Sequence, residues 1–171
     1  MKNQTKWAIA VFLAVCFLVS VTAASVSTDQ KKGLCINLEK TTLKNDNFRK
    51  VLYTGQYNQL VLMSLKPHED IGMEVHKDTD QFFYFMDGKG KCIVNGNEYE
   101  VCDGSAVFVP AGAHHNVINT MKNQDLKLFT TYSPPEHQDG IVRKTKAQAN
   151  DPNKAESFNG KTTEKDLKMQ K

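Results

Sequence analysis

Short β-rich segments recur at intervals of roughly ten residues between Val51 and Tyr132, and this spacing limits the fold more than any other feature. Gly, Pro, Asn or Asp separates most of these segments. The clearest boundary is Asn95-Gly96, because both positions of a tight hairpin turn need positive φ. The pattern predicts an all-β barrel or sandwich. The expected strands are 59–65, 81–86, 91–94, 97–102, 106–109, 117–119 and 126–132.

The first 23 residues are predicted to be a secretory signal peptide. Lys2 and Lys6 precede an apolar run from Trp7 to Val21, and no acidic residue occurs before Asp29. A membrane span needs about 20 apolar residues, so this run is short for one, although an uncleaved anchor is the alternative. We therefore expect a secreted protein, extracellular or periplasmic, with no stable membrane insertion after cleavage.

Composition bounds the partners and the thiol chemistry. The chain has 22 Lys+Arg against 19 Asp+Glu, and this net charge of +3 is too small to indicate a nucleic-acid partner. Signal cleavage would leave Cys35, Cys92 and Cys102, an odd number in an oxidising compartment. The sequence leaves two alternatives: either two of these cysteines form a disulfide and the third is free, or all three are free thiols. None of the three stands in a Cys-x-x-Cys pair, which argues against a thiolate metal site.

The remaining chain divides into three parts. Residues 24–49 are polar and lysine-rich, and we expect an arm that docks loosely or adds an edge strand. Residues 50–135 hold the predicted barrel. Residues 136–171 are basic and poor in large apolar side chains, which predicts a flexible tail with a short helix near 144–149.

Four polar side chains are placed to meet inside such a barrel. Residues two apart in a strand project from the same face, so Glu74 and His76 are expected to point together. Gln81 begins the next strand and faces the same way if that strand pairs back across the loop. His115 comes from a segment distant in sequence. A carboxylate, an amide oxygen and two imidazoles together would suit a divalent metal ion.

Two spaced motifs in this region resemble those of the cupin superfamily. The second motif, Gly, five residues, Pro-x-Gly, two residues, His, three residues, Asn, matches at every position: Gly104, Pro110, Gly112, His115 and Asn119. The first motif matches in spacing, with three changed identities: His68 for Gly, Glu74 for His and Gln81 for Glu. The resemblance implies a single jelly-roll barrel over about 50–135, similar to small RmlC-like cupins described as mannose-6-phosphate-isomerase-like.

Carried over by position, the resemblance implies the metal ligands Glu74, His76, Gln81 and His115. The two exchanges move the ligand anion to another position and keep the net ligand charge, which favours a retained ion. Fe, Mn, Ni and Zn all suit such mixed nitrogen and oxygen ligands. Polar partners of a water-filled cavity are the alternative role for Glu74 and Gln81. His114 is expected to face outward.

Alternation within 81–86 divides its aromatic residues between two faces. Phe83 and Phe85 share the parity of Gln81 and should line the barrel. The opposite face would carry Phe82, Tyr84 and Met86. An apolar outer face indicates either cover by the N-terminal segment or a homodimer interface.

Two functions follow from this pattern. One is a metal-dependent enzyme acting on a small molecule, isomerase-like or dioxygenase-like, for which the sequence assigns no catalytic residue. The other is a non-catalytic protein that binds a sugar or another small ligand, with a structural metal or none. No Gly-x-Ser-x-Gly motif and no phosphate-binding Gly loop is present, which argues against hydrolase and nucleotide functions.

Overall fold

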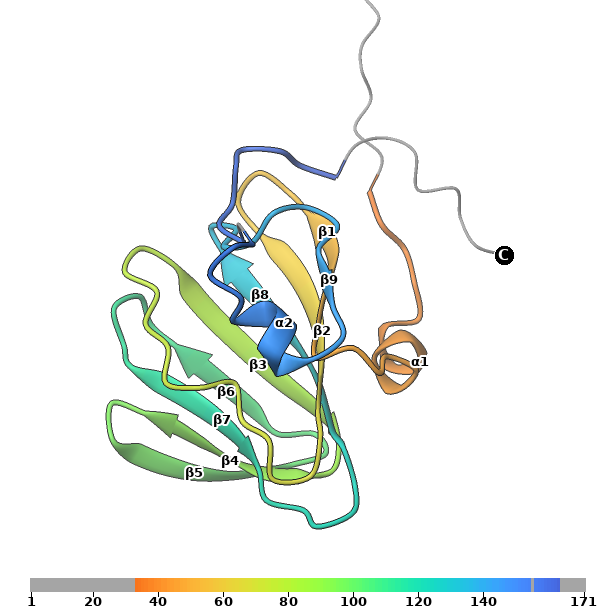
Figure 1. The fold of residues 1–171 in the computed structure, drawn as a ribbon, viewed down its shortest axis with the longest axis vertical. Coiled ribbons are helices and arrows are strands. Elements are labelled where there is room, and N and C mark those ends of the chain that lie inside the picture. The colour runs from red at the N-terminus through yellow and green to blue at the C-terminus, as the bar shows by residue number, and fades with distance from the viewer. Residues whose placement is uncertain (1–32, 155, 164–171) are drawn as a thin grey trace, which may run out of the picture. The chain divides into compact units, whose positions relative to one another are not determined.

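A computed structural model describes residues 33–154 and 156–163 (Figure 1). The predicted signal peptide, residues 1–23, lies outside the described residues. No helix within the described ranges is long and apolar enough to cross a membrane.

The described strands form two antiparallel sheets, arranged as a jelly-roll-like sandwich. The larger sheet has the order β6-β3-β8-β2-β1-β9 and the smaller one the order β5-β4-β7. The strands of the larger sheet are β1 (Arg49–Thr54), β2 (Gln59–Leu65), β3 (Asp80–Asp87), β6 (Ala106–Val109), β8 (Leu126–Ser133) and β9 (Val142–Arg143). Those of the smaller sheet are β4 (Lys89–Val94), β5 (Asn97–Cys102) and β7 (His115–Asn119). The fold prediction is confirmed, and every strand expected from the sequence is present.

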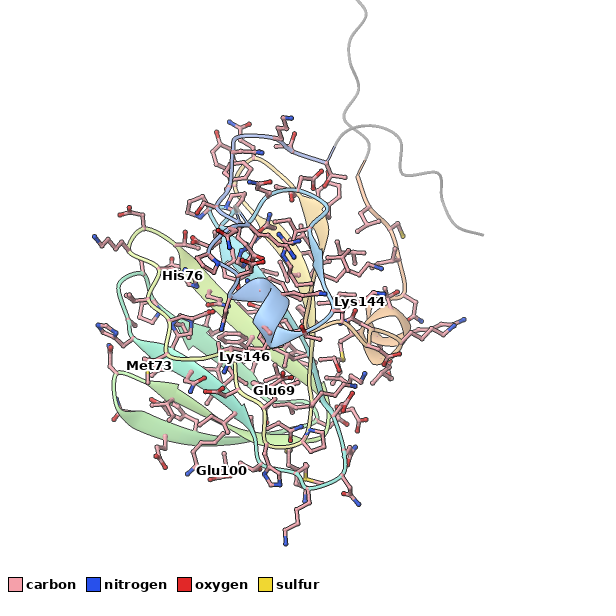
Figure 2. The ribbon with its side chains drawn as sticks, in the orientation of Figure 1. Glu69, Met73, His76, Glu100, Lys144 and Lys146 are labelled. Atoms are coloured by element: carbon pink, nitrogen blue, oxygen red, sulfur yellow. The ribbon has the colours of Figure 1, made fainter. Side chains whose placement is uncertain are left out.

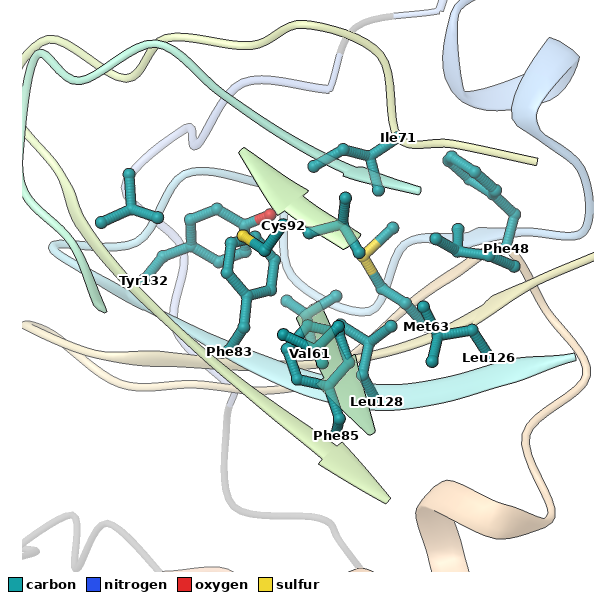
Figure 3. Packing of buried hydrophobic residues seen from close by; sticks show 14 of the residues in the cluster. Phe48, Val61, Met63, Ile71, Phe83, Phe85, Cys92, Leu126, Leu128 and Tyr132 are labelled. Carbon is teal, nitrogen blue, oxygen red and sulfur yellow. The ribbon is translucent and has the colours of Figure 1, made fainter. Parts of the chain in front are cut away.

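The hydrophobic core lies between the inner faces of the two sheets (Figure 3). Phe83 and Phe85 are fully buried, while Phe82 and Tyr84, at the alternating positions, are only half-buried, which confirms the predicted alternation along β3. Cys92 of β4 belongs to the same core cluster. Burying an aromatic or aliphatic side chain of this size stabilises the fold by about 1.5–3 kcal/mol, so this inner face holds the sheets together.

Two glycines are required in the smaller sheet, one in the hairpin turn between β4 and β5 and one where β4 and β7 approach closely. Asn95 and Gly96 have φ of 48° and 81°, and Val94 pairs with Asn97 across the turn, which confirms the predicted hairpin. On the preceding strand, a Cβ on Gly90 would lie 2.5 Å from the carbonyl oxygen of Ile118. The close approach of β4 and β7 therefore needs glycine at position 90.

The N-terminal arm is tied to the larger sheet. It contains α1 (Leu38–Leu43), whose first turn is capped by the Asn37 side chain, and this helix contacts β3 and β8. Behind it, the Lys127 ammonium of β8 donates to the carbonyl of Asn45 (2.7 Å) and pairs with Asp46 (2.9 Å). The arm adds no edge strand in the described part, because the strand beside β1 is β9 from the other end of the chain.

Residues 136–163 differ from the predicted flexible tail wherever the structure describes them. β9 pairs with β1, and the backbone of His137 bridges Ser157. The amide of buried Gln59 accepts from the N–H of His137 (3.0 Å) and donates to its carbonyl (2.7 Å). The lysine-rich composition concealed these contacts, because they use backbone and polar groups rather than large apolar side chains. The short predicted helix is present as α2 (Lys146–Ala149).

The three cysteines of the described residues are free thiols. Cys35 and Cys102 are exposed, and Cys92 is buried. Burial raises the pKa of the Cys92 thiol to about 12, so it behaves as an inert core side chain. Of the two alternatives left open by the sequence, the structure has three free thiols.

Candidate metal centre

The loop between β2 and β3 carries Glu74 and His76, of which His76 is labelled in Figure 2, and its backbone is hydrogen-bonded to the start of β7. Glu74 and His115 exchange two backbone hydrogen bonds of 2.9 Å each, forming an isolated bridge. The carbonyl of His76 accepts from the N–H of Gly112 (2.8 Å), whose φ of 79° suits the turn before β7. The second motif therefore positions both its own histidine and the loop that carries the first motif.

Three of the four predicted ligands converge. One ligand atom from each of Glu74, His76 and His115 lies within 4.8 Å of the other two. The two imidazole rings are 5.4 Å apart, centroid to centroid, at 50°. His115 is fully buried, whereas the side chains of His76 and Glu74 are 12% and 22% exposed. The group is therefore closed on the His115 side and reaches solvent on the side of the loop.

His115 is held in the tautomer that leaves a lone pair free. Its Nδ1 lies 3.0 Å from the carbonyl oxygen of Ala113, which can only accept, so Nδ1 carries the proton. Burial lowers the pKa of His115, so the ring is neutral at physiological pH. Its Nε2 is buried and has no hydrogen-bond partner among the described residues. This is the arrangement that metal-binding histidines adopt.

His76 has the same arrangement with a carboxylate in place of the carbonyl. Its Nδ1 lies 3.3 Å from Glu136 Oε1, and its buried Nε2 is 3.6 Å from Glu74 Oε2, too far for a hydrogen bond. Burial alone would lower the pKa of His76, but the nearby carboxylates of Glu136 and Glu74 outweigh it and raise the pKa to about 9. Without an ion the ring is therefore protonated at neutral pH.

Gln81 lies on the inner face of β3 and pairs in register with Tyr132, whose ring is 5.5 Å from that of His76. It is 2% exposed, and its Nε2 donates to the hydroxyl of Thr130 (3.1 Å). Its Oε1 is buried with no partner in the described ranges. Three buried ligand-type atoms without partners, two imidazole nitrogens and an amide oxygen, together with a carboxylate, fit a divalent ion. The residues present therefore suit the metal that the resemblance implies.

Sequence reasoning missed the polar residues that surround these four. Tyr132 is fully buried and places its ring 5.5 Å from that of His76. Arg49 of β1 reaches Glu74, with Nη2 3.4 Å from Oε1. The segment after the barrel supplies Glu136, His137 and Glu156. The sequence offered a local signal only for Glu136 and His137, which directly follow Pro134-Pro135 at the end of the expected barrel.

The other polar residues of the motifs have structural positions. His68 occupies a turn with φ of 61°, and His114 is exposed, as expected. Asp80 accepts from the N–H of Ala111 (2.8 Å), fixing the turn before β7. Asn119 donates to three backbone carbonyls at 2.8–3.0 Å and closes the loop ends below the barrel. None of these side chains joins the converging group.

Comparison with known proteins shows three informative similarities. The chain is 43% identical over 124 residues to the uncharacterised protein YrkC of Bacillus subtilis, covering 69% of this chain and 66% of that protein. It is 28% identical over 92 residues to the quercetin 2,3-dioxygenase of the same organism. This aligned region covers 48% of this chain and only 27% of that enzyme. The crystal structure of BH2720 from Bacillus halodurans is 40% identical, with a TM-score of 0.67, over 69% of this chain and 93% of that one.

Residues 61–132 match the cupin domain family, and this range contains all four predicted ligands. The jelly-roll-like arrangement of the two sheets and the similarity to the BH2720 structure agree with this match. The chain belongs to the cupin superfamily.

Proposed function

We propose that this protein holds a divalent ion, Fe, Mn, Ni or Zn, through Glu74, His76, Gln81 and His115 and acts on a small molecule, in an isomerase-like or dioxygenase-like reaction. The observation that carries the proposal is the convergence of Glu74, His76 and His115, with the buried Nε2 atoms of both histidines and the buried Oε1 of Gln81 left without partners among the described residues. Groups of this kind cost free energy when buried without partners, and an ion would satisfy them together.

An ion of this class would supply Lewis acidity toward an oxygen-bearing substrate. The chain's own residues define how such a substrate approaches. His115 and Gln81 are buried, while Glu74, His76 and Glu136 border the side that reaches solvent. A small molecule would therefore arrive over the loop of residues 66–79.

Tyr132, the register partner of Gln81, adds a buried hydroxyl. Burial raises its pKa, so the phenol stays protonated and can donate but does not serve as a base. Glu136, whose side chain is 32% exposed, is more exposed than Glu74, the other carboxylate beside His76. The similarity to quercetin 2,3-dioxygenase supports the dioxygenase-like alternative for the reaction class.

A non-catalytic binding protein, for a sugar or another small ligand, is the second candidate. It is favoured by the changed ligand identities, Glu74 for His and Gln81 for Glu, which depart from the first cupin motif. In that case the ion would be structural or absent.

Metal analysis of purified protein tests the proposal. We expect close to one divalent ion per chain in the wild type and loss of the ion in the double variant His76→Ala/His115→Ala. His114→Ala is the matched control, since this exposed neighbour lies outside the group. Full occupancy in the double variant would refute the ligand assignment. Chelation that lowers the melting temperature by many degrees without affecting small-molecule binding would favour the structural role.

We also propose export of the protein and its association as a homodimer. The basic start and apolar run of residues 1–23 support export, and cell fractionation tests it. The dimer is supported by Phe108, which is 77% exposed on edge strand β6, 4.6 Å from the ring of Phe82, beside a hollow of about 500 Å³. Phe108→Ser should convert a dimer into a monomer in sedimentation analysis, and a monomeric wild type would refute the assignment.

A further inference from the structure

Glu156, from the segment after the barrel, lies between two guanidinium groups next to the candidate metal centre. Its Oε2 is 2.6 Å from Arg49 Nη1, and its Oε1 is 2.5 Å from Arg143 Nε. The three side chains are 15%, 6% and 17% exposed, so these ion pairs are shielded from solvent. Shielded pairs of this kind interact more strongly than surface pairs.

The two arginines are brought together by strand pairing. Arg49 of β1 stands directly opposite Arg143 of β9 in the register of the larger sheet. Like charges opposite each other in a sheet repel, and the Glu156 carboxylate between them compensates this repulsion. Its backbone is fixed as well, because the carbonyl of Glu156 accepts from the N–H of Gln138 (2.8 Å).

Arg49 is shared unequally between two carboxylates. Its contact with Glu156 is short, at 2.6 Å, while its contact with Glu74 is long, at 3.4 Å. Glu74 is also the carboxylate of the converging group. A guanidinium and a divalent cation compete for the same carboxylate oxygens, so the position of Arg49 sets how available Glu74 is for an ion.

We propose that Glu156 is a positioning residue that holds Arg49 back from Glu74, so that Glu74 stays available to the metal ion. This inference rests on the proposed function, since it concerns the same ion. Without the charge of Glu156, two uncompensated guanidiniums would remain, and the Arg49 fork would close onto Glu74. The segment after the barrel would in this way set the metal affinity of a centre whose ligands all lie within the barrel.

Cobalt(II) binding to the chelated full-length protein tests this role. Titration calorimetry gives the affinity, and the visible absorption of bound Co²⁺ reports its ligand geometry. We expect Glu156→Gln to lower Co²⁺ affinity about tenfold and to alter the spectrum, in line with the effect of residues that support metal ligands. Glu98→Gln is the matched control, because Glu98 pairs with Lys91 at 2.7 Å on the smaller sheet, away from the centre.

The decisive variant is Glu156→Gln/Arg49→Gln. If Glu156 acts by restraining Arg49, removal of Arg49 restores Co²⁺ affinity to within about threefold of wild type, with the wild-type spectrum. A merely structural role predicts the opposite, because the double variant has lost more contacts. Double-variant affinity at or below that of Glu156→Gln would overturn the inference, as would wild-type affinity in Glu156→Gln itself.

Two further results keep the test decisive. If Glu156→Gln does not fold, Arg49→Gln alone decides, since it should bind Co²⁺ at least as tightly as the wild type, and a loss beyond threefold would overturn the inference. If the wild-type protein binds no Co²⁺, both the proposed function and this inference are overturned. Wild-type binding with no effect of the variants overturns the inference alone.

Discussion

Metal binding at this centre should be strongly pH-dependent, because the ion must displace a proton from His76. The pKa of that imidazole is about 9, so at pH 7 about one ring in a hundred is neutral and ready to bind. Apparent affinity for Co²⁺ should therefore rise by up to tenfold per pH unit between pH 6 and 8. The Glu136 side chain, which raises the pKa of His76, is 32% exposed, so solvent screens its charge and the rise in affinity falls short of this maximum. We expect a rise in Co²⁺ affinity of at least about tenfold between pH 6 and pH 8.

Proton release gives the sharper measurement. His115 is already neutral, since burial lowers its pKa, so only His76 should release a proton when the ion binds at pH 7. Calorimetry in two buffers with different ionisation enthalpies should show close to one proton released per ion. Glu136→Gln removes the main partner that raises the pKa and should reduce this number. Affinity that is constant from pH 6 to 8, with no proton released, would refute the reasoning.

Three other predictions concern stability. In chelated protein, the raised pKa of His76 stabilises the fold fully below pH 6.5, and this stabilisation is lost as pH rises through about 9. The lowered pKa of His115 has the opposite effect: its contribution to stability is present above pH 6.5 and is lost as pH falls. The melting temperature should therefore peak near neutral pH, and a steady rise up to pH 9 would contradict this. Asn119→Ala removes three hydrogen bonds to backbone carbonyls and should cost about 2–4 kcal/mol in urea unfolding while leaving Co²⁺ affinity unchanged; weaker metal binding would show that Asn119 does more than close loops. Gly90→Ala should cost about 1–3 kcal/mol, whereas Gly33→Ala, with nothing within 4 Å of the added Cβ, should have little effect; equal effects would refute the steric explanation.

Local pattern was enough to predict the barrel. Alternating burial along β3 and the Asn95-Gly96 turn depend on neighbours in sequence, and both are present in the structure. The convergence of Glu74, His76 and His115 was also predictable, because motif spacing fixes which loop bridges to β7. The assignment of these residues and Gln81 as ligands stays a prediction.

The surroundings of the centre were not predictable from local pattern. Arg49 meets Glu156 through a sheet edge formed by residues more than ninety positions apart, β1 and β9. Neither residue belongs to an alternating or spaced motif. A lysine-rich stretch with few apolar side chains is typical of solvated chain, and its order here depends on ion pairs and backbone bonds that composition does not record.

The side chains that surround the candidate metal centre extend further along the chain than the barrel itself. The cupin match stops at residue 132, while the carboxylate that orients His76 and the one that holds Arg49 come after it. A protein shortened to the matched range would keep every predicted ligand and lose both of these carboxylates. Two cupins with the same four ligands and different C-terminal segments would accordingly differ in how tightly, and at what pH, they hold an ion, so function in this group is better compared over whole chains than over the shared domain.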